Sequence, residues 1–150
     1  MKLLSLPCYC ATLRQTARAV TAMYEEALAG SGLHATQHTA LQVLSRMPNL
    51  TTTDLAGAIG MDQTTATRTL ALIRKAGLAI DRPGEDRRER CWGLTSMGET
   101  TLERLRPKWE GAQAAFERYL GRNEAAKLKR ASYRAAGKLS AYGAARGSSP

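Results

Sequence analysis

The stretch that decides the fold runs over residues 51–99 and reads TTTDLAGAIGMDQTTATRTLALIRKAGLAIDRPGEDRRERCWGLTSMGE. Its first part predicts a short helix, because Thr51 can serve as the N-cap with Asp54 three residues later. Gly60 can end that helix, and Asp62 can cap the next one after a tight turn. Two helices separated by a tight turn are typical of a helix-turn-helix.

The second half of the same stretch changes from a helical to an alternating pattern. Gly77 ends the second helix, and strands are predicted over residues 78–82 and 88–95 with the turn PGED between them. A short helix, a turn, a longer helix and a β-hairpin follow one another in this order. The stretch therefore predicts a winged helix-turn-helix.

The second helix of the motif has an apolar inner face and a polar outer face. Ala66, Leu70 and Ile73 recur at helical spacing and should face the core. Short polar side chains on the other face can approach base edges, and an arginine there can bond guanine or a phosphate. This outward face consists of Gln63, Thr64, Thr67 and Arg68.

Two helices precede this core. Apolar residues recur every three or four positions over residues 10–28, as one helix face requires, and the glycines that follow end the helix. A second helix is predicted over residues 36–47. It stops before Pro48, because the residue before a proline avoids the helical region.

Two long helices should close the chain. Thr95 can cap the first, and Pro107 should interrupt and bend it. The second begins near Asn123 and ends in a frayed tail. We therefore predict an N-terminal dimerisation helix at residues 1–34, a DNA-binding domain at 35–95, dimerisation helices at 96–143 and a disordered tail at 144–150.

The amphipathic terminal helices predict a homodimer. Neither terminal segment has a second domain that covers its apolar stripe, so a partner chain is the expected cover. The class we predict is mainly α with a small β-hairpin wing: a winged helix-turn-helix core between N- and C-terminal dimerisation helices.

The composition is typical of a cytoplasmic protein with a polyanionic partner. The formal net charge is +9, which suits double-stranded DNA. No apolar run approaches the roughly 18 residues of a membrane-spanning helix. Three cysteines, a small odd number, fit a reduced compartment better than a disulfide framework.

We expect no enzymatic activity and no cofactor. The sequence has no Gly-rich phosphate loop, no HExxH motif and no nucleophile elbow. A thiol peroxidase based on Cys10 is the one enzyme that the residues leave open. A basic protein that binds DNA regardless of sequence is the other alternative, although the outward threonines favour selective reading.

Residues 51–99 resemble the core of the multiple-antibiotic-resistance regulator (MarR) family. The most specific elements are LIRKAGL, the hairpin tip with Asp86 and Arg88, and GLTSMG, in this order and spacing. The flanking helices match that family's dimerisation parts, so the resemblance covers nearly the whole chain. It implies a dimeric transcriptional regulator, most often a repressor, whose second motif helix enters the major groove while its wing reaches the minor groove.

The hairpin tip is the predicted minor-groove contact. Arg88 can enter a narrow minor groove, and Asp86 can fix its direction by a charge-assisted bond. The alternative is that Arg87 and Arg88 only solubilise a turn. The full set of DNA contacts we predict is Gln63, Thr64, Thr67, Arg68, Arg74, Arg87, Arg88 and Arg90. A dimer would read a pseudo-palindromic operator with half-sites about one helical turn apart.

Cys8 and Cys10 leave three interpretations open, of which the first is redox sensing. The first helix partly resembles that of the family's organic-hydroperoxide-sensing branch, because Cys10 precedes Arg18, Thr21 and Tyr24 at matching intervals. A thiol at a helix N-terminus is favoured as thiolate, the form that attacks peroxide. Tyrosines of that branch are replaced here by Arg14 and, early in the second helix, by a residue near Ala35.

The second interpretation is a soft metal or metalloid effector, and the third is a small ligand. Cys8 and Cys10 could chelate one ion, with Cys91 or a partner subunit completing the site. His34 and His38 are more simply polar surface or pocket residues.

A small phenolic or aromatic ligand would instead occupy the cleft between the dimerisation helices and the winged domain. The candidate lining residues there are Tyr24, Met47 and Trp109, with core packing as the alternative.

Overall fold

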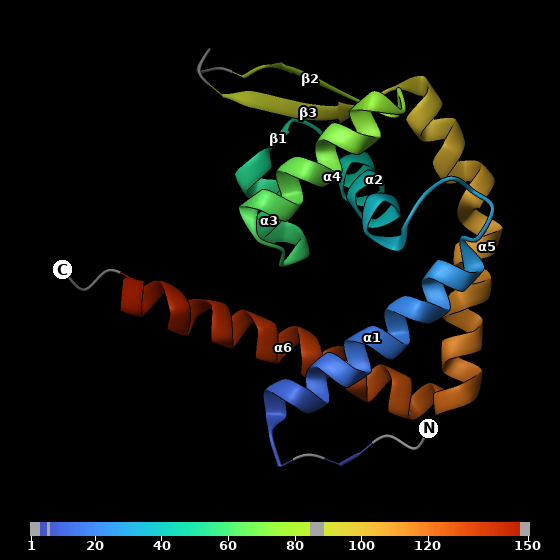
Figure 1. Ribbon diagram of the computed structural model, residues 1–150, viewed down its shortest axis with the longest axis vertical. Coiled ribbons are helices and arrows are strands. Elements are labelled where there is room, and N and C mark those ends of the chain that lie inside the picture. Colours follow the sequence, from blue (N-terminus) through green and yellow to red (C-terminus); the bar gives the residue numbers. More distant parts are fainter. Residues whose placement is uncertain (1–3, 6, 85–88, 148–150) are drawn as a thin grey trace. The chain divides into compact units, whose positions relative to one another are not determined.

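The computed structural model describes residues 4–5, 7–84 and 89–147 (Figure 1). In chain order the elements are α1 (Tyr9–Ala27), α2 (Ala35–Arg46), β1 (Leu50–Thr51), α3 (Thr52–Ile59), α4 (Gln63–Lys75), β2 (Ala79–Pro83), β3 (Arg90–Leu94), α5 (Ser96–Leu120) and α6 (Arg122–Gly147). Helices with a small antiparallel sheet are the fold class that the sequence predicts. The chain divides into two compact units, residues 1–112 and 113–150, with the division inside α5.

The helix-turn-helix begins and ends where its caps predict. The Thr51 hydroxyl oxygen accepts the Asp54 N–H at 3.1 Å, and the Asp54 carboxylate accepts the Thr51 N–H at 3.2 Å, a complete capping box. Gly60 then ends α3 in the left-handed conformation, at φ 75°. Asp62 caps α4 by accepting the Thr65 N–H at 2.8 Å. These local bonds fix both ends of the turn between the two helices.

The core of the first unit joins α2, α3, α4 and the sheet. Leu41 and Leu44 of α2 pack with Leu55 of α3 and with Leu70 and Ile73 of α4, and all five are fully buried. Burying a leucine or isoleucine side chain contributes about 1.5–3 kcal/mol each. The apolar face of α4 is thus anchored, which leaves its opposite face in solvent.

A three-stranded antiparallel sheet in the order β1-β3-β2 packs beside α4. The sequence predicts the β2–β3 hairpin. It does not predict β1, because a strand of two residues is too short to show alternating polar and apolar side chains. Asn49, with φ 66°, turns the chain into β1, and its N–H bonds the Trp92 carbonyl at 3.0 Å. Trp92 of β3 lies opposite Leu50 on one side and Asp81 on the other.

The start of α5 fits closely against the junction of α4 and β2. The Thr95 hydroxyl donates to the Gly77 carbonyl at 2.6 Å and accepts the Gly98 N–H at 3.1 Å. Gly98 lies so near this junction that a Cβ there would stand 2.1 Å from the Leu78 carbonyl oxygen. The predicted cap at Thr95 is confirmed, and it also binds α5 to the winged domain.

One carboxylate joins the end of α1 to the start of α2. Glu25 accepts the Ala35 N–H at 2.9 Å with one oxygen, and its other oxygen lies 3.1 Å from His34 Nδ1. The His34 N–H also bonds the Gln37 side chain at 2.8 Å. These bonds satisfy N–H groups that the first turn of α2 would otherwise leave open.

The two closing helices differ from the prediction at Pro107 and at the C-terminal end of α6. α5 is continuous through Pro107, so the interruption predicted there is wrong. Pro107 is exposed, and an exposed carbonyl that loses its helical N–H can bond water instead. α6 follows Gly121, which has φ 86°, and continues to Gly147 rather than ending near residue 143. No helix in the described ranges is both long and apolar enough to cross a membrane.

Candidate nucleic-acid interface

The outward face of α4 carries the polar side chains that the sequence places there. Gln63, Thr64, Thr67 and Arg68 are all exposed, while the intervening inner face is buried. The N-cap and the packed inner face hold the helix in place, so this polar row is presented on a rigid support. A rigid helix with an exposed polar face is what major-groove reading requires.

The side chains of this row differ in the hydrogen bonds that they can still make. The Thr67 hydroxyl donates to the Gln63 carbonyl at 2.8 Å, so its oxygen remains available as an acceptor. Arg68 has no ion-pair partner within the described part of the chain. Its guanidinium group is therefore available to an acceptor outside the protein.

The hairpin tip falls outside the described residues. Asp86, Arg87 and Arg88 lie in the gap between residues 84 and 89, so their predicted contacts stay predictions. The two residues that flank the gap are bonded to each other: the Gly84 N–H donates to the Glu89 carbonyl at 2.9 Å. The two strands are thus paired up to the beginning of the tip.

Arg74 and Arg90, two of the predicted DNA contacts, share one carboxylate. Asp81 Oδ1 accepts from Arg74 Nη1 at 3.1 Å, while Asp81 Oδ2 accepts from Arg90 Nε at 2.8 Å and lies 2.6 Å from Arg90 Nη2. The hydrogen bonds from Arg90, then those from Arg74, hold the pKa of Asp81 below its ordinary value, although partial burial acts the other way. No local sequence pattern indicates this cluster, because its members come from α4, β2 and β3.

The same cluster reaches the centre of the winged domain through Trp92. The Arg74 guanidinium carbon lies 5.8 Å from the centre of the Trp92 ring, within cation–π range. Trp92 is buried, and its indole N–H donates to the Thr52 hydroxyl at 3.0 Å. Residues of α3, α4, β2 and β3 are therefore connected by consecutive polar contacts.

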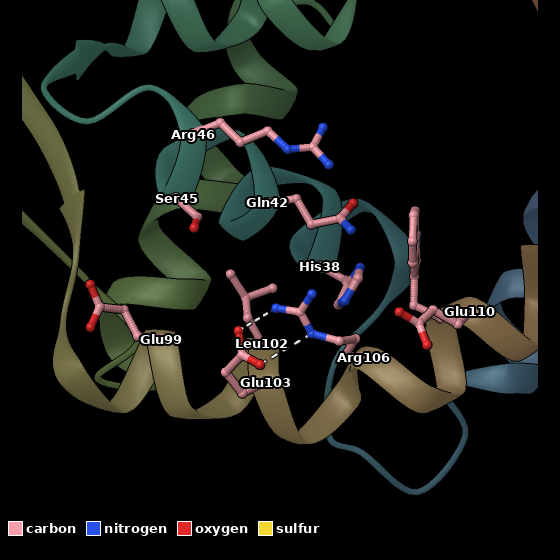
Figure 2. Close-up of a pocket in the computed structure, with 10 residues that line it drawn as sticks. His38, Gln42, Ser45, Arg46, Glu99, Leu102, Glu103, Arg106 and Glu110 are labelled. Carbon is pink, nitrogen blue, oxygen red and sulfur yellow. Dashed lines mark hydrogen bonds and ion pairs between the residues drawn. The ribbon is translucent and has the colours of Figure 1, made fainter.

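A cavity of about 480 Å³ lies between α2 and α5 (Figure 2). Trp109, one of the predicted lining residues, borders this cavity. Met47 is the C-cap residue of α2 and is half exposed. Neither Met47 nor Tyr24 lines the cavity. Figure 2 shows residues of α2 facing residues of α5 across the space. The lining residues are His38, Gln42, Ser45, Arg46, Glu99, Leu102, Glu103, Arg106, Trp109 and Glu110.

Charged groups in this cavity are partly paired. Arg106 Nε donates to Glu103 at 3.1 Å, and this partner keeps the pKa of the Glu103 carboxyl below its ordinary value. Burial lowers the pKa of His38 below its ordinary value of 6.5, which favours the neutral ring at pH 7. Arg46 has no ion pair within the described part of the chain. The cavity therefore offers an aromatic wall, a neutral imidazole and an unpaired guanidinium group.

Cys8, Cys10 and Cys91 form no disulfide in the described part of the chain. Cys8 is the N-cap residue of α1 and Cys10 lies in its first turn, and both are exposed. Cys91 is half-buried in β3. Within the described ranges no three His, Cys, Asp or Glu side chains gather closely enough to hold a metal ion. A metal at Cys8 and Cys10 would need ligands from elsewhere.

Comparisons with known proteins agree with this geometry. A profile of the MarR family matches residues 31–89. The chain is 34% identical to the transcriptional regulator MosR of M. tuberculosis, solved in complex with DNA, with a TM-score of 0.79 over 89% of this chain and 97% of that one. It is 28% identical over 96 residues to the uncharacterized HTH-type transcriptional regulator YwoH of Bacillus subtilis (strain 168), covering 64% of this chain and 70% of YwoH.

A third protein shares the fold at lower identity. The transcriptional repressor CouR, bound to a 23-mer DNA duplex, superimposes with a TM-score of 0.76 at 22% identity, covering 89% of this chain and 99% of CouR. The resemblance seen in residues 51–99 is confirmed by the family profile and by the MosR match. With its winged helix-turn-helix and the exposed polar face of α4, the chain belongs to the MarR family of DNA-binding transcriptional regulators.

Proposed function

We propose that the protein is a homodimeric repressor that reads a pseudo-palindromic operator with the outward face of α4. The exposed row Gln63, Thr64, Thr67 and Arg68 on an anchored helix is the observation that carries this proposal. Arg68 would bond guanine or a phosphate, and the shorter side chains would contact base edges. The wing tip, with Arg87 and with Arg88 oriented by Asp86, would bind the neighbouring minor groove.

Arg74 and Arg90 take a different part in this proposal from the one that the sequence predicts. Both guanidinium groups are bonded to Asp81. We assign their main role to the junction between α4 and the hairpin, with direct DNA contact secondary. Sequence reading at the major groove then rests on the four residues of the outward row.

Dimerisation is supported by exposed apolar side chains on the terminal helices. None of the residues of α1 is buried within the described chain, and Leu13 is 52% exposed. On α6, Leu139 and Tyr142 are exposed by 63% and 60%. Exposed apolar side chains on several helices are covered most simply by the same helices of a second copy. A two-fold dimer would present two α4 helices to two half-sites.

The cavity between α2 and α5 supports release by a small aromatic or phenolic ligand. Its volume of about 480 Å³ falls within the usual size of small-molecule sites, roughly 300–1,000 Å³. Trp109 and Leu102 would contact the ring of such a ligand, and Arg46 or Gln42 would bond its polar group. Binding that changes the position of α2 would displace the core that supports α4, since Leu41 and Leu44 pack there.

The exposed thiols support a second route of release. A Cys10 thiolate would attack a hydroperoxide and become a sulfenic acid, with release of the alcohol. The Cys8 thiol could then condense with it to a disulfide and release water, although so short a loop strains the bond. An external thiol could form the mixed disulfide instead. A soft metal ion bound by Cys8 and Cys10 remains the alternative for the same residues.

Fluorescence anisotropy on DNA from upstream of the protein's own gene tests the proposal. Reduced protein should bind this duplex in preference to a random duplex of the same length. One equivalent of an organic hydroperoxide should release it reversibly, and Cys10→Ser should abolish that response if the thiol route operates. If the wild-type protein binds selectively and the oxidant does not change this binding, release by a small ligand is the remaining route. Titrating phenolic acids into the protein–DNA complex would test it. Equal binding to both duplexes would refute the proposed function.

A further inference from the structure

The carboxylate of Asp81 is placed to control two arginines beside the DNA-reading helix. It lies in the middle of β2 with only 11% of its side chain exposed. Arg74 comes from the last turn of α4 and Arg90 from β3, and each has about half of its side chain in solvent. Both oxygens of Asp81 are used, one for each arginine.

The strand register explains why these groups meet. Asp81 is paired with Trp92, and Pro83 with Arg90. Residues two apart on a strand share a face, so Asp81, Arg90 and Trp92 lie on one face of the hairpin. Since Arg74 of α4 contacts both Asp81 and Trp92, the cluster joins the hairpin to α4 at a single point.

We propose that Asp81 is a specificity-determining positioning residue: by holding Arg74 and Arg90 it fixes the hairpin against α4 and keeps both guanidinium groups from the phosphates of arbitrary DNA. The inference rests on the proposed DNA-binding function. Its physical basis is that phosphate contacts add affinity without sequence information, whereas base reading requires a fixed geometry.

Two opposite effects follow from neutralising Asp81. Asp81→Asn frees two guanidinium groups near the DNA-reading face and raises the net charge by one. Affinity for a random duplex should therefore increase several-fold, and each new phosphate contact should steepen its salt dependence by about 0.9 in log–log slope. Affinity for the operator should decrease at the same time, because the hairpin loses its fixed angle to α4.

The experiment measures the ratio of the two affinities. The operator probe is a duplex that the wild-type protein selects from a randomised library, and the reference is a scrambled duplex of equal composition. We expect the ratio to fall at least tenfold for Asp81→Asn and to recover in part for Asp81→Glu, which keeps the charge. Glu124→Gln is the matched control, since it frees Lys127 on α6, a helix that supplies none of the proposed DNA contacts. It should leave the ratio unchanged.

A second variant guards against simple loss of structure. Arg90→Gln removes one partner but leaves the carboxylate, so it should weaken operator binding without any gain on the scrambled duplex. If Asp81→Asn lowers the thermal midpoint of the protein so far that its DNA binding cannot be measured, the affinities of Arg90→Gln for the two duplexes decide whether the inference holds. An unchanged affinity ratio in a folded Asp81→Asn protein, or an equal loss on both duplexes, would overturn the inference while leaving the proposed function intact. Failure of the wild type to select any sequence would overturn both.

Discussion

Arg68 is the side chain on α4 whose contribution to sequence reading can be isolated most directly. It is exposed, and no carboxylate in the described chain pairs with it. Arg74, six residues later, is held by Asp81 instead. An unpaired guanidinium group loses no ion pair when it binds DNA, so its removal reports on the DNA contact alone.

We expect Arg68→Ala to cost about 1–3 kcal/mol at one operator position and to relax the preference for the base there. Arg68→Lys should retain the phosphate-type attraction but lose bidentate reading of guanine. Anisotropy titrations against single-base variants of the operator would measure both effects. An equal loss on operator and random duplexes for the alanine variant would show that Arg68 contacts only the backbone.

Single-residue roles could be predicted from the sequence only where they depend on local spacing. The outward position of Thr67 and Arg68 follows from helical periodicity alone, and so does burial of Leu70. The bonds of Asp81 to Arg74 and Arg90 depend on the register of two strands and on where a helix packs against them. No local pattern contains that information, which is why an acid that looked like an ordinary strand residue proved to be the centre of a cluster.

Among the elements, α4 depends on its N-terminal cap. Hydrogen bonds from the Thr65 hydroxyl and N–H hold the pKa of Asp62 below its ordinary value of 3.8. A lowered folded-state pKa means that the charged carboxylate stabilises the fold above about pH 4, and that this contribution is lost as the pH falls through the folded value.

Asp62→Ala should therefore lower the thermal midpoint at pH 7, and the difference from wild type should shrink as the pH falls below 3.8. Asp62→Asn is the control, because asparagine caps well but does not titrate in this range. Circular dichroism melts at one protein concentration would measure the midpoints. A difference between wild type and Asp62→Ala that stays constant from pH 7 to pH 3 would contradict the cap's role.

The contact of α5 with the α4–β2 junction predicts a strong effect of one methyl group. In Gly98→Ala the new Cβ would lie 2.1 Å from the Leu78 carbonyl oxygen, a backbone atom that cannot move aside alone. We expect a loss of about 2 kcal/mol or more in the free energy of unfolding. Gly57→Ala is the matched control, since nothing lies within 4 Å of its Cβ position in α3.

Urea titration should show that control to be neutral or more stable by up to about 1 kcal/mol, because alanine favours helix over glycine. If Gly98→Ala were as stable as wild type, the close approach of α5 to the junction would be wrong.

Element positions were predictable where caps and glycines mark them. Thr51, Gly60, Asp62 and Gly77 mark the ends of the two helices, since the side chains of Thr51 and Asp62 each accept the N–H three residues later, and the two glycines have positive φ. Strand β1 was not predictable, because its two residues become a strand only by pairing with β3. Apart from Trp109, the lining of the cavity was not predictable either, because α2 and α5 are distant in sequence.

For the whole molecule, the proposed dimer is tested most directly on α6. Leu139 is 63% exposed in the single chain, and its apolar surface should be buried against a second copy. Leu139→Asp should shift the protein towards monomer, because a carboxylate would be buried without a partner. Sedimentation velocity over a range of concentrations would measure the shift.

Ala141→Asp provides the control for that experiment, since Ala141 lies on the opposite side of the helix from the stripe that contains Leu139. A protein that is monomeric before any substitution would refute the dimer. Operator affinity should fall with the monomer fraction, because one α4 alone can occupy only one half-site.

The bonds of Glu25 have a consequence for how two signals could be combined. α1 carries Cys8 and Cys10 at one end and Glu25 near the other, and a straight helix of 19 residues spans about 28 Å. Glu25 is bonded to the first residues of α2, whose next turn places His38 in the cavity. A tilt of α1 must therefore move the start of α2 or break the Glu25 bonds. Oxidation at one end of α1 and a ligand in the cavity would both act on the same turn of α2. Either signal alone would then suffice to alter that turn.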